Sequence, residues 1–282
     1  MIEVVRPGPL ATVQDLGRPG RAHLGVPCSG AADGRAFRLA NRLVGNPEGA
    51  AAVELTLGGA ALRFHRHAWI AVTGAPAPLR INGSAQGTHA PAHVPDGALV
   101  EFGTPPSGLR SYLAVRGGVV VEEVLGSRSC DLLSGLGPAP LSPGDRLPVG
   151  PTKGLDDITV DVAPAPHMPE TPVLHIRPGP RDDWFTDEAM ATLTSTLYEV
   201  SPESNRVGVR LEGPPLVRAR DGELGSEGMV TGALQVPPSG LPIIFLADHP
   251  TTGGYPVVAV LASSAIADAA QLRPGQRLRF RV

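Results

Sequence analysis

The chain has 282 residues, of which 42% are hydrophobic and 18% charged, and its formal net charge is −3. This balance is typical of a folded globular protein, and the lack of a basic run argues against a nucleic-acid partner. Because no apolar stretch of about 18 residues occurs, the sequence predicts neither a signal peptide nor a membrane span, and we expect a cytoplasmic protein.

The basic residues and the cysteines restrict the chemistry further. Lys153 is the single lysine among 24 basic residues, and it lies in "PTKGLDD" rather than in a Gly-Lys-Ser/Thr loop. If the reaction uses ATP through a P-loop, or biotin through a carrier lysine, those sites must therefore lie in another chain. Cys28 and Cys130 are too few for a disulfide framework and form no CxxC pair for zinc.

The first half of the sequence has the pattern of short strands. From residue 1 to about 149, apolar runs alternate with Gly, Pro and Asn turns at intervals of roughly ten residues. Strands are expected within residues 60–74, 98–102 and 111–121. Residues 33–45 predict a helix, with Asp33 as N-cap and Gly45 as the left-handed residue after its end.

A proline-rich stretch at residues 148–172 predicts a junction, with one strand, "DITVDV", at residues 157–162. We therefore expect two domains, residues 1–160 and 161–282.

After the junction the pattern resumes. It predicts a strand at residues 173–179, a helix near residues 186–200, five further strands and a short helix at residues 264–272. The strands are expected within residues 207–213, 232–237, 242–248, 256–262 and 277–282. Turn signals at this spacing favour antiparallel closed sheets in a mainly β protein.

Polar residues gather in four loops, which are the usual carriers of function on a β scaffold. The first loop holds Gln14, Asp15, Arg18 and Ser29 among glycines that would let a ligand approach the backbone. The alternative is that these side chains only cap local turns.

The second and third loops offer groups for hydrogen bonding and proton transfer. Asn205 and Arg206 could bind a carboxylate or carbonyl, although a structural Asn in a hairpin turn explains the pattern as well. Ser226, Glu227 and Gln235 belong to the third loop, where Glu227 is either a general base, an orienting carboxylate or simply exposed.

The fourth loop, "ADHPTTGGYPVV", is the densest in polar groups. Its hydroxyls and bare amides could converge on one anion or carbonyl oxygen, and its candidate residues are Asp248, Thr251, Thr252, Gly253, Gly254 and Tyr255.

Histidine pairs are a weak signal for metal. We place His65 and His67 on one face of a strand, and His89 and His93 follow nearby. Because no nearby acid or cysteine completes either set, we predict no metal site.

Several long motifs together resemble one family. They are "VQDLGRPGRAHLGVPCSGAAD", "AAVELTLGG", "YLAVRGGV", "LGSRS", "SNRVGVRL", "SEGMVTGALQVPPSGLPI" and "DHPTTGGYPVVAV". In this order they are similar to the KipA family, also called allophanate hydrolase subunit 2 or the C subunit of 5-oxoprolinase. The resemblance implies two cyclophilin-like β-barrel domains with a few short helices. It also implies a partner similar to KipI, the B subunit of 5-oxoprolinase, together with a protein similar to its A subunit.

The resemblance implies three functions of different classes. The leading one is a component of a heteromeric 5-oxoprolinase, active in the complex, which uses ATP to convert 5-oxo-L-proline to L-glutamate. In that reading Glu227, Asp248 and Tyr255 are catalytic, and the other candidates in the four loops bind substrate. The alternatives are a carboxyltransferase half-site of a urea carboxylase-like system, with biotin supplied in trans, and a non-enzymatic KipI–KipA type regulator of a histidine kinase.

Three positions depart from the pattern of the family that the chain resembles. Pro250 stands where a Gln commonly follows the His, and Ala265 stands where an Asp is expected. Arg181 stands where a Gln is common and adds a charge to the expected ligand loop. If relatives use the first two positions in catalysis, these substitutions bear directly on activity.

Overall fold

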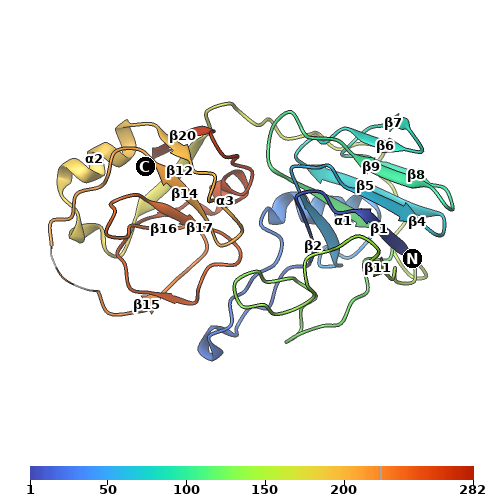
Figure 1. Cartoon of the computed structure of the whole chain (residues 1–282), viewed down its shortest axis with the longest axis horizontal. Coiled ribbons are helices and arrows are strands. Elements are labelled where there is room, and N and C mark those ends of the chain that lie inside the picture. The colour runs from blue at the N-terminus through green and yellow to red at the C-terminus, as the bar shows by residue number, and fades with distance from the viewer. Residues whose placement is uncertain (221, 223) are drawn as a thin grey trace. The chain divides into compact units, whose positions relative to one another are not determined.

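The computed structural model describes residues 1–220, 222 and 224–282, which form two compact units (Figure 1). Unit 1 consists of Met1–Arg18, Ser29–Asp131 and Gly135–His167. Unit 2 consists of Pro19–Cys28, Leu132–Ser134 and Met168–Val282. Each unit has its own hydrophobic core and is described by itself.

Unit 1 contains two antiparallel sheets. One has the strand order β11–β1–β4–β9–β6–β7, with the respective bounds Arg146–Leu147, Ile2–Arg6, Ala61–Phe64, Leu99–Phe102, Leu79–Ile81 and Ser84–Gln86. The other has the order β2–β3–β10–β5–β8, with the bounds Leu10–Gln14, Ala52–Thr56, Arg110–Val115, Ala68–Gly74 and Pro91–Val94.

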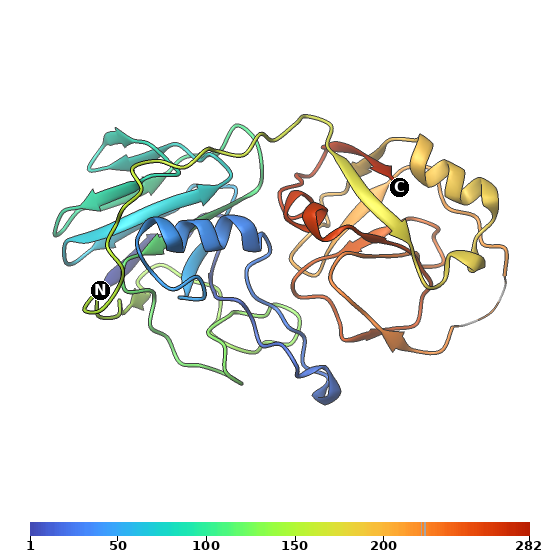
Figure 2. The ribbon, with the colours of Figure 1, turned by 180° about the vertical axis from the view of Figure 1, so that it is seen from behind.

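Strand β10 shows how unit 1 is layered. All six of its residues are buried, because one face joins the main core and the other is covered by helix α1, Gly34–Leu43. Figure 2 shows α1 lying along this sheet. The helix begins as predicted, with the Asp33 carboxylate accepting a hydrogen bond from Ala36 N at 2.9 Å. Gly45 has the predicted left-handed φ of 68°.

A buried hydrogen-bond chain ties α1 to the sheet beneath it. Tyr112 Oη donates to Glu54 Oε2 at 2.8 Å and accepts from Asp33 N at 2.7 Å, while Ala32 N also donates to Glu54. Burial, followed by the neighbouring Glu54 carboxylate, raises the pKa of Tyr112 well above its ordinary value. The hydroxyl therefore keeps its proton and remains a donor at physiological pH.

Tyr112→Phe is expected to destabilise unit 1 by about 1–3 kcal/mol, because it leaves a buried carboxylate and a buried N–H short of a partner. Urea unfolding followed by the fluorescence of Trp69, in a Trp184→Phe background, measures the change. Tyr255→Phe is the control for loss of a phenol hydroxyl outside unit 1: Tyr255 lies in unit 2 and is 44% exposed, so this substitution should change the Trp69 transition by no more than about 0.5 kcal/mol. Equal effects of the two substitutions would contradict the structural role of the Tyr112 hydroxyl.

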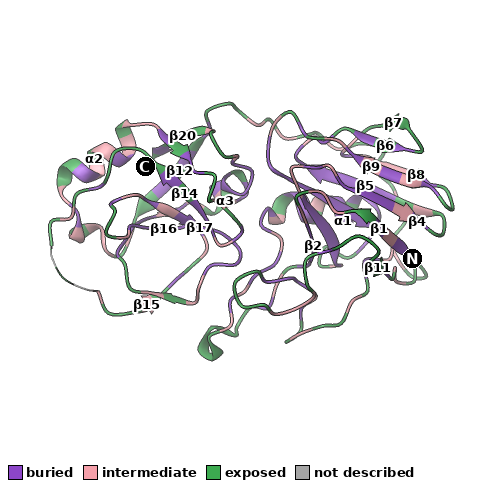
Figure 3. Ribbon diagram, viewed as in Figure 1, coloured by how far each residue is buried: buried purple, intermediate pink, exposed green. Residues whose placement is uncertain are grey.

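Unit 2 is built on a closed barrel with the strand order β12–β19–β16–β17–β14–β13–β20. The respective bounds are Val173–Pro178, Val257–Leu261, Ala233–Gln235, Ile243–Phe245, Gly208–Glu212, Tyr198–Val200 and Arg277–Arg281. Strands β12 and β20 pair in parallel, and the other barrel neighbours pair antiparallel. The buried residues of these strands form the core of the unit, and Figure 3 shows them in purple.

Helices and a short ribbon complete unit 2. Helix α2 spans Asp187–Ser195 and begins at Thr186, whose hydroxyl caps Ala189 N, and helix α3 spans Ser263–Ala269. Short 3₁₀ turns span Ala22–Leu24 in the first polar loop and Asp182–Trp184 after β12. The ribbon consists of β15, Glu227–Gly228, and β18, Thr252–Gly253. The mainly β prediction with a few short helices is confirmed.

Three local predictions are wrong. The helix expected near residues 186–200 ends at Ser195, because Tyr198–Val200 joins the barrel instead. Residues 157–162 form no strand, and the side chains of Val160 and Val162 are exposed. The pair His65 and His67 lies in the turn between β4 and β5 rather than on a strand. Among the helices of the described residues, none has the length and apolarity needed to cross a bilayer.

Candidate functional site

The ribbon β15–β18 brings the third and fourth polar loops together. Glu227 pairs with Gly253 and Gly228 with Thr252, and Met229 N donates to the carbonyl of Thr251 at 2.9 Å. These two loops are adjacent in space although they are separated by two barrel strands in the sequence. The structure therefore places Glu227 beside the Thr-Thr-Gly-Gly segment.

Gln235 fixes the fourth loop from the barrel side. Its Nε2 donates to the carbonyl of Tyr255 at 3.2 Å. A Cβ on Gly253 would lie 2.5 Å from the same Nε2, so a larger residue at this position would displace the Gln235 amide. Gln235 is thus buried against the loop, and its amide orients the backbone that carries Tyr255.

The outer surface of this pair of loops is accessible. Exposed residues here are Ser226, Gly228, Thr252, Gly254 and Tyr255, and Thr251 and Glu227 are half-buried. Figure 3 shows the ribbon at β15 in the colour of exposed residues. The Thr252 hydroxyl, the Tyr255 phenol and glycine backbone are therefore accessible to solvent, and Thr251 is partly so. We call this set, residues 226–228 and 251–255, the ribbon site.

Arg181 reaches the ribbon site from the loop after β12. Its guanidinium binds the Glu227 carboxylate through Nε, at 2.9 Å from Oε1, and through Nη2. The side chains are 37% and 27% exposed, respectively, so this is a bidentate ion pair at the surface. Nη1 of Arg181 has no hydrogen-bond partner among the described residues and is available to an external anion.

The ion pair sets the charge state of both partners. The hydrogen bond from Arg181 is the largest effect on Glu227 and lowers its pKa below the ordinary value. Desolvation opposes this shift, and the Arg181 charge adds to it. The same hydrogen bond raises the pKa of Arg181. Glu227 is therefore ionised and bound to Arg181 at neutral pH, which suits an orienting carboxylate better than a general base.

Arg206 and Asp248 form a second, buried ion pair. Arg206 Nε lies 2.9 Å from Asp248 Oδ2, Nη2 lies 3.0 Å from Oδ1, and both side chains are fully buried. Leu132 N also donates to Asp248 Oδ2 at 3.1 Å. Because its oxygens are already committed and no solvent reaches them, the geometry argues against Asp248 as a proton carrier. Its role is to join the second and fourth polar loops.

The side chains of Asn205 and His249 also form hydrogen bonds with backbone groups. Asn205 Oδ1 accepts from Val207 N at 2.8 Å and from Gly208 N at 3.3 Å, which is the structural turn that we weighed as an alternative. His249 Nδ1 donates to the carbonyl of Pro250 at 2.7 Å, and its ring stacks on Phe245 with centroids 5.9 Å apart.

The first polar loop forms a buried network in unit 1. The Asp15 carboxylate accepts from Gly17 N, Ser127 Oγ, Arg128 N and Ser129 Oγ at 2.6–2.8 Å. Arg18 is 1% exposed and donates to the carbonyls of Val124 and Ser129, while Gln14 and Ser29 both donate to the carbonyl of Cys130.

This arrangement favours the local-turn alternative for Gln14, Asp15, Arg18 and Ser29, because most of their polar atoms bind the chain itself. Among the described residues, Gln14 Oε1 and Arg18 Nη1 are buried without a hydrogen-bond partner. Ser127 and Ser129 were not predicted as partners of Asp15, although "LGSRS" was among the motifs that carried the resemblance. Within the described residues, His, Cys, Asp and Glu form no group of three or more that could hold a metal ion.

Comparison with known proteins assigns the chain to a family. The model of the carboxyltransferase domain, subdomain A and B, matches residues 24–282, and the chain belongs to this family. It is 37% identical to the C subunit of 5-oxoprolinase from Escherichia coli (strain K12), over 99% of this chain and 90% of that protein. It is 34% identical to urea amidolyase of Lachancea kluyveri over 99% of this chain, which corresponds to 17% of that longer protein.

A solved structure shows the same fold. The crystal structure of TTHA0988 matches with a TM-score of 0.89 at 35% identity, over 100% of this chain and 56% of that one. The chain thus spans about half the length of this structural relative, whereas it covers most of the Escherichia coli protein. The resemblance to the KipA family, which includes the C subunit of 5-oxoprolinase, is confirmed.

Proposed function

We propose that this chain is the C subunit of a heteromeric, ATP-dependent 5-oxoprolinase that converts 5-oxo-L-proline to L-glutamate. The observation that carries the proposal is the near full-length match to the C subunit of the Escherichia coli 5-oxoprolinase, at 37% identity over 99% of this chain and 90% of that protein. The proposed partners are a KipI-related protein, similar to the B subunit, and a protein similar to the A subunit.

In the proposed complex, the ribbon site binds the substrate and ATP activates its amide. The substrate 5-oxoproline carries a carboxylate and a cyclic amide, and the amide must be activated because a lactam resists hydrolysis. In our proposal ATP would transfer its γ-phosphoryl group to the lactam oxygen and release ADP. Addition of water at the ring carbon, cleavage of the C–N bond and release of phosphate to a second water would then give L-glutamate. Because this chain has no P-loop, a P-loop type of ATP site would lie in a partner. The ribbon site then binds the substrate or its phosphorylated form.

Within the site, Arg181 is the proposed carboxylate-binding residue and Glu227 its positioning residue. The open Nη1 of Arg181 can donate to the substrate carboxylate while Nε and Nη2 remain on Glu227. Thr251, Thr252 and Tyr255 are proposed to hold the polar oxygens of the ring or phosphate. This assignment replaces the general-base role that the sequence suggested for Glu227.

The test is ATP hydrolysis that depends on 5-oxoproline, measured with the co-expressed complex and with each protein alone. Turnover only in the complete complex is expected. An intact complex, verified by gel filtration, that hydrolyses no ATP in response to 5-oxoproline contradicts the proposal. The matched substrate control is proline, which has the same ring and carboxylate but lacks the lactam carbonyl.

Carboxyl transfer is the second candidate, favoured by the match to the carboxyltransferase domain and to urea amidolyase. In that reaction the ribbon site would face a carboxylated biotin carried by another chain, since Lys153 here has no flanking methionines. Streptavidin detection of a biotinylated protein in the purified complex would favour this candidate over 5-oxoprolinase activity.

A further inference from the structure

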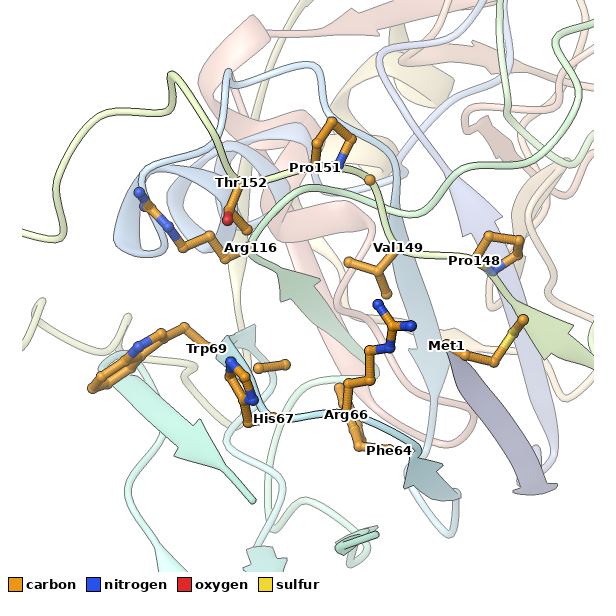
Figure 4. Close-up of a pocket in the computed structure, with 12 residues that line it drawn as sticks. Met1, Phe64, Arg66, His67, Trp69, Arg116, Pro148, Val149, Pro151 and Thr152 are labelled. Atoms are coloured by element: carbon orange, nitrogen blue, oxygen red, sulfur yellow. The ribbon is translucent and has the colours of Figure 1, made fainter. Parts of the chain in front are cut away.

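Unit 1 contains a hollow of about 630 Å³ that none of the predicted site residues lines. It lies between the β4–β5 turn, which carries Arg66 and His67, and the segment of residues 148–152 (Figure 4). The volume falls within the range of roughly 300–1,000 Å³ that is usual for small-molecule sites. Size alone therefore permits an organic ligand, and the lining chemistry decides which one.

The charged side chains that line the hollow are all cationic, and no Asp or Glu is among the lining residues. Arg116 Nη1 donates to the carbonyls of Val44 and Asp156, both at 2.7 Å. These contacts hold the guanidinium in place without neutralising its charge by a carboxylate. Arg116 thus supplies a fixed positive potential to one wall.

Arg66 is the complementary group. Its side chain is exposed, and it forms no hydrogen bond or ion pair with any described residue. Figure 4 shows its guanidinium directed into the space beside Val149. The acid on nearby β1, Glu3, is bound to His65 instead, with 2.7 Å between Oε2 and Nε2. The five donors of Arg66 are therefore available for a carboxylate or phosphate.

A ring surface lies beside these cations. Trp69 is 41% exposed, and its ring meets the His93 ring edge-on with centroids 5.5 Å apart. The His67 ring stacks on the His93 ring, with centroids 6.4 Å apart and an interplanar angle of 25°. Trp69 and His67 both line the hollow. A ligand with a planar ring can stack at this edge while its acidic group reaches Arg66.

We propose that the unit 1 hollow is a binding site for a small organic anion that carries a planar ring. Arg66 binds its carboxylate or phosphate, Arg116 contributes positive potential, and the rings of Trp69 and His67 contact its flat part. The site belongs to unit 1 and shares no residue with the ribbon site, so the proposal stands or falls independently of 5-oxoprolinase activity.

The test uses Trp69 as a reporter. In Trp184→Phe, the fluorescence of Trp69 is titrated with three probes: benzoate, adenosine monophosphate and inorganic phosphate. Saturable quenching is expected with a ring-bearing anion, and comparison of benzoate with adenosine monophosphate identifies the preferred acidic group. Inorganic phosphate shows whether the acidic group binds without a ring, and benzyl alcohol is the uncharged control.

Arg66→Ala is expected to weaken the best probe about tenfold or more, the loss of a charge-assisted bidentate contact, and Arg66→Lys should weaken it less. The matched control is Arg80→Ala, an exposed arginine on β6 of the same unit, which should change affinity by less than about twofold. Thermal unfolding verifies that each variant is folded.

Two results would overturn the proposal. One is quenching that does not saturate, or that is equal in Arg66→Ala and the parent protein. The other is a complete lack of probe binding combined with loss of partner capture in Arg66→Ala, which would make this face a protein interface. If the intact parent complex shows no 5-oxoproline-dependent turnover but this chain still binds the anion, the proposed function is contradicted and the anion site is retained.

Discussion

Arg181→Ala in the intact complex is expected to raise KM for 5-oxoproline about 10- to 100-fold, with a much smaller change in kcat. The reason is the loss of one charge-assisted contact to the substrate carboxylate. The contact is made in the ground state and in the transition state alike, so its loss weakens binding more than it slows chemistry. Steady-state kinetics over a range of 5-oxoproline concentrations measure the two constants separately.

Glu227→Gln separates a positioning role from a catalytic one. As a positioning residue, Glu227 acts on KM through Arg181, whereas loss of a general base would lower kcat by about 10²–10⁴-fold. The pKa of Glu227 is lowered by Arg181, so the ion pair is intact above the ordinary carboxyl range and is lost as pH falls through the folded-state value. The parent complex should therefore show a rise in KM at acidic pH that Glu227→Gln lacks.

Arg279→Ala is the matched control for Arg181→Ala. Arg279 is an exposed arginine on β20 of the same unit, and its removal should leave both kinetic constants unchanged. A large fall in kcat with constant KM in Glu227→Gln would restore the general-base assignment. Unchanged KM in Arg181→Ala would remove Arg181 from substrate binding.

Asp248→Ala is expected to destabilise unit 2 by about 3–5 kcal/mol, since it leaves the fully buried Arg206 guanidinium without its counter-charge. The variant also loses the acceptor of Leu132 N. Urea unfolding followed by Trp184 fluorescence, in a Trp69→Phe background, reports on unit 2 alone. An effect of this size on stability, with wild-type KM in the variant that remains folded, would identify Asp248 as a structural residue.

Two further variants test the cause of that loss. Replacing both partners, as Arg206→Leu with Asp248→Leu, should recover much of the stability, because no unpaired charge remains. Glu212→Ala, at an exposed position on β14, should cost no more than about 0.5 kcal/mol. A full loss of stability in the double variant would show that the hydrogen bond to Leu132, rather than the charge pair, dominates.

The sequence predicted the features that depend on neighbouring residues. Helix α1 was predicted with its N-cap, because Asp33 and the apolar stripe of Phe37, Ala40 and Val44 are local signals. The strand predicted at residues 157–162 does not form. Alternation of apolar and polar residues shows only that one face of a strand could be buried, whereas Val160 and Val162 are exposed and pair with no strand among the described residues. Pattern alone therefore could not establish pairing.

The site was predictable in its loops but not in its pairings. The density of hydroxyls and glycines identified the fourth loop, whereas the ion pair between Arg181 and Glu227 joins positions 46 residues apart. Buried polar residues were the hardest to interpret, since Asp15 and Asp248 have the chemistry of ligand-binding residues. Burial and hydrogen bonding to the backbone, which a sequence does not display, distinguish the two roles.

The parallel pairing of β12 with β20 affects how unit 2 folds during synthesis. Val173 pairs with Arg279 and Leu174 with Phe280. The first barrel strand to be synthesised, β12, therefore cannot complete its pairing until the last one, β20, has been synthesised. Closing such a long loop is slow, and one edge of β12 stays unpaired until then. During synthesis the nascent barrel should therefore remain an open, aggregation-prone sheet until residue 281 has left the ribosome, and chaperone demand should fall on this half of the chain.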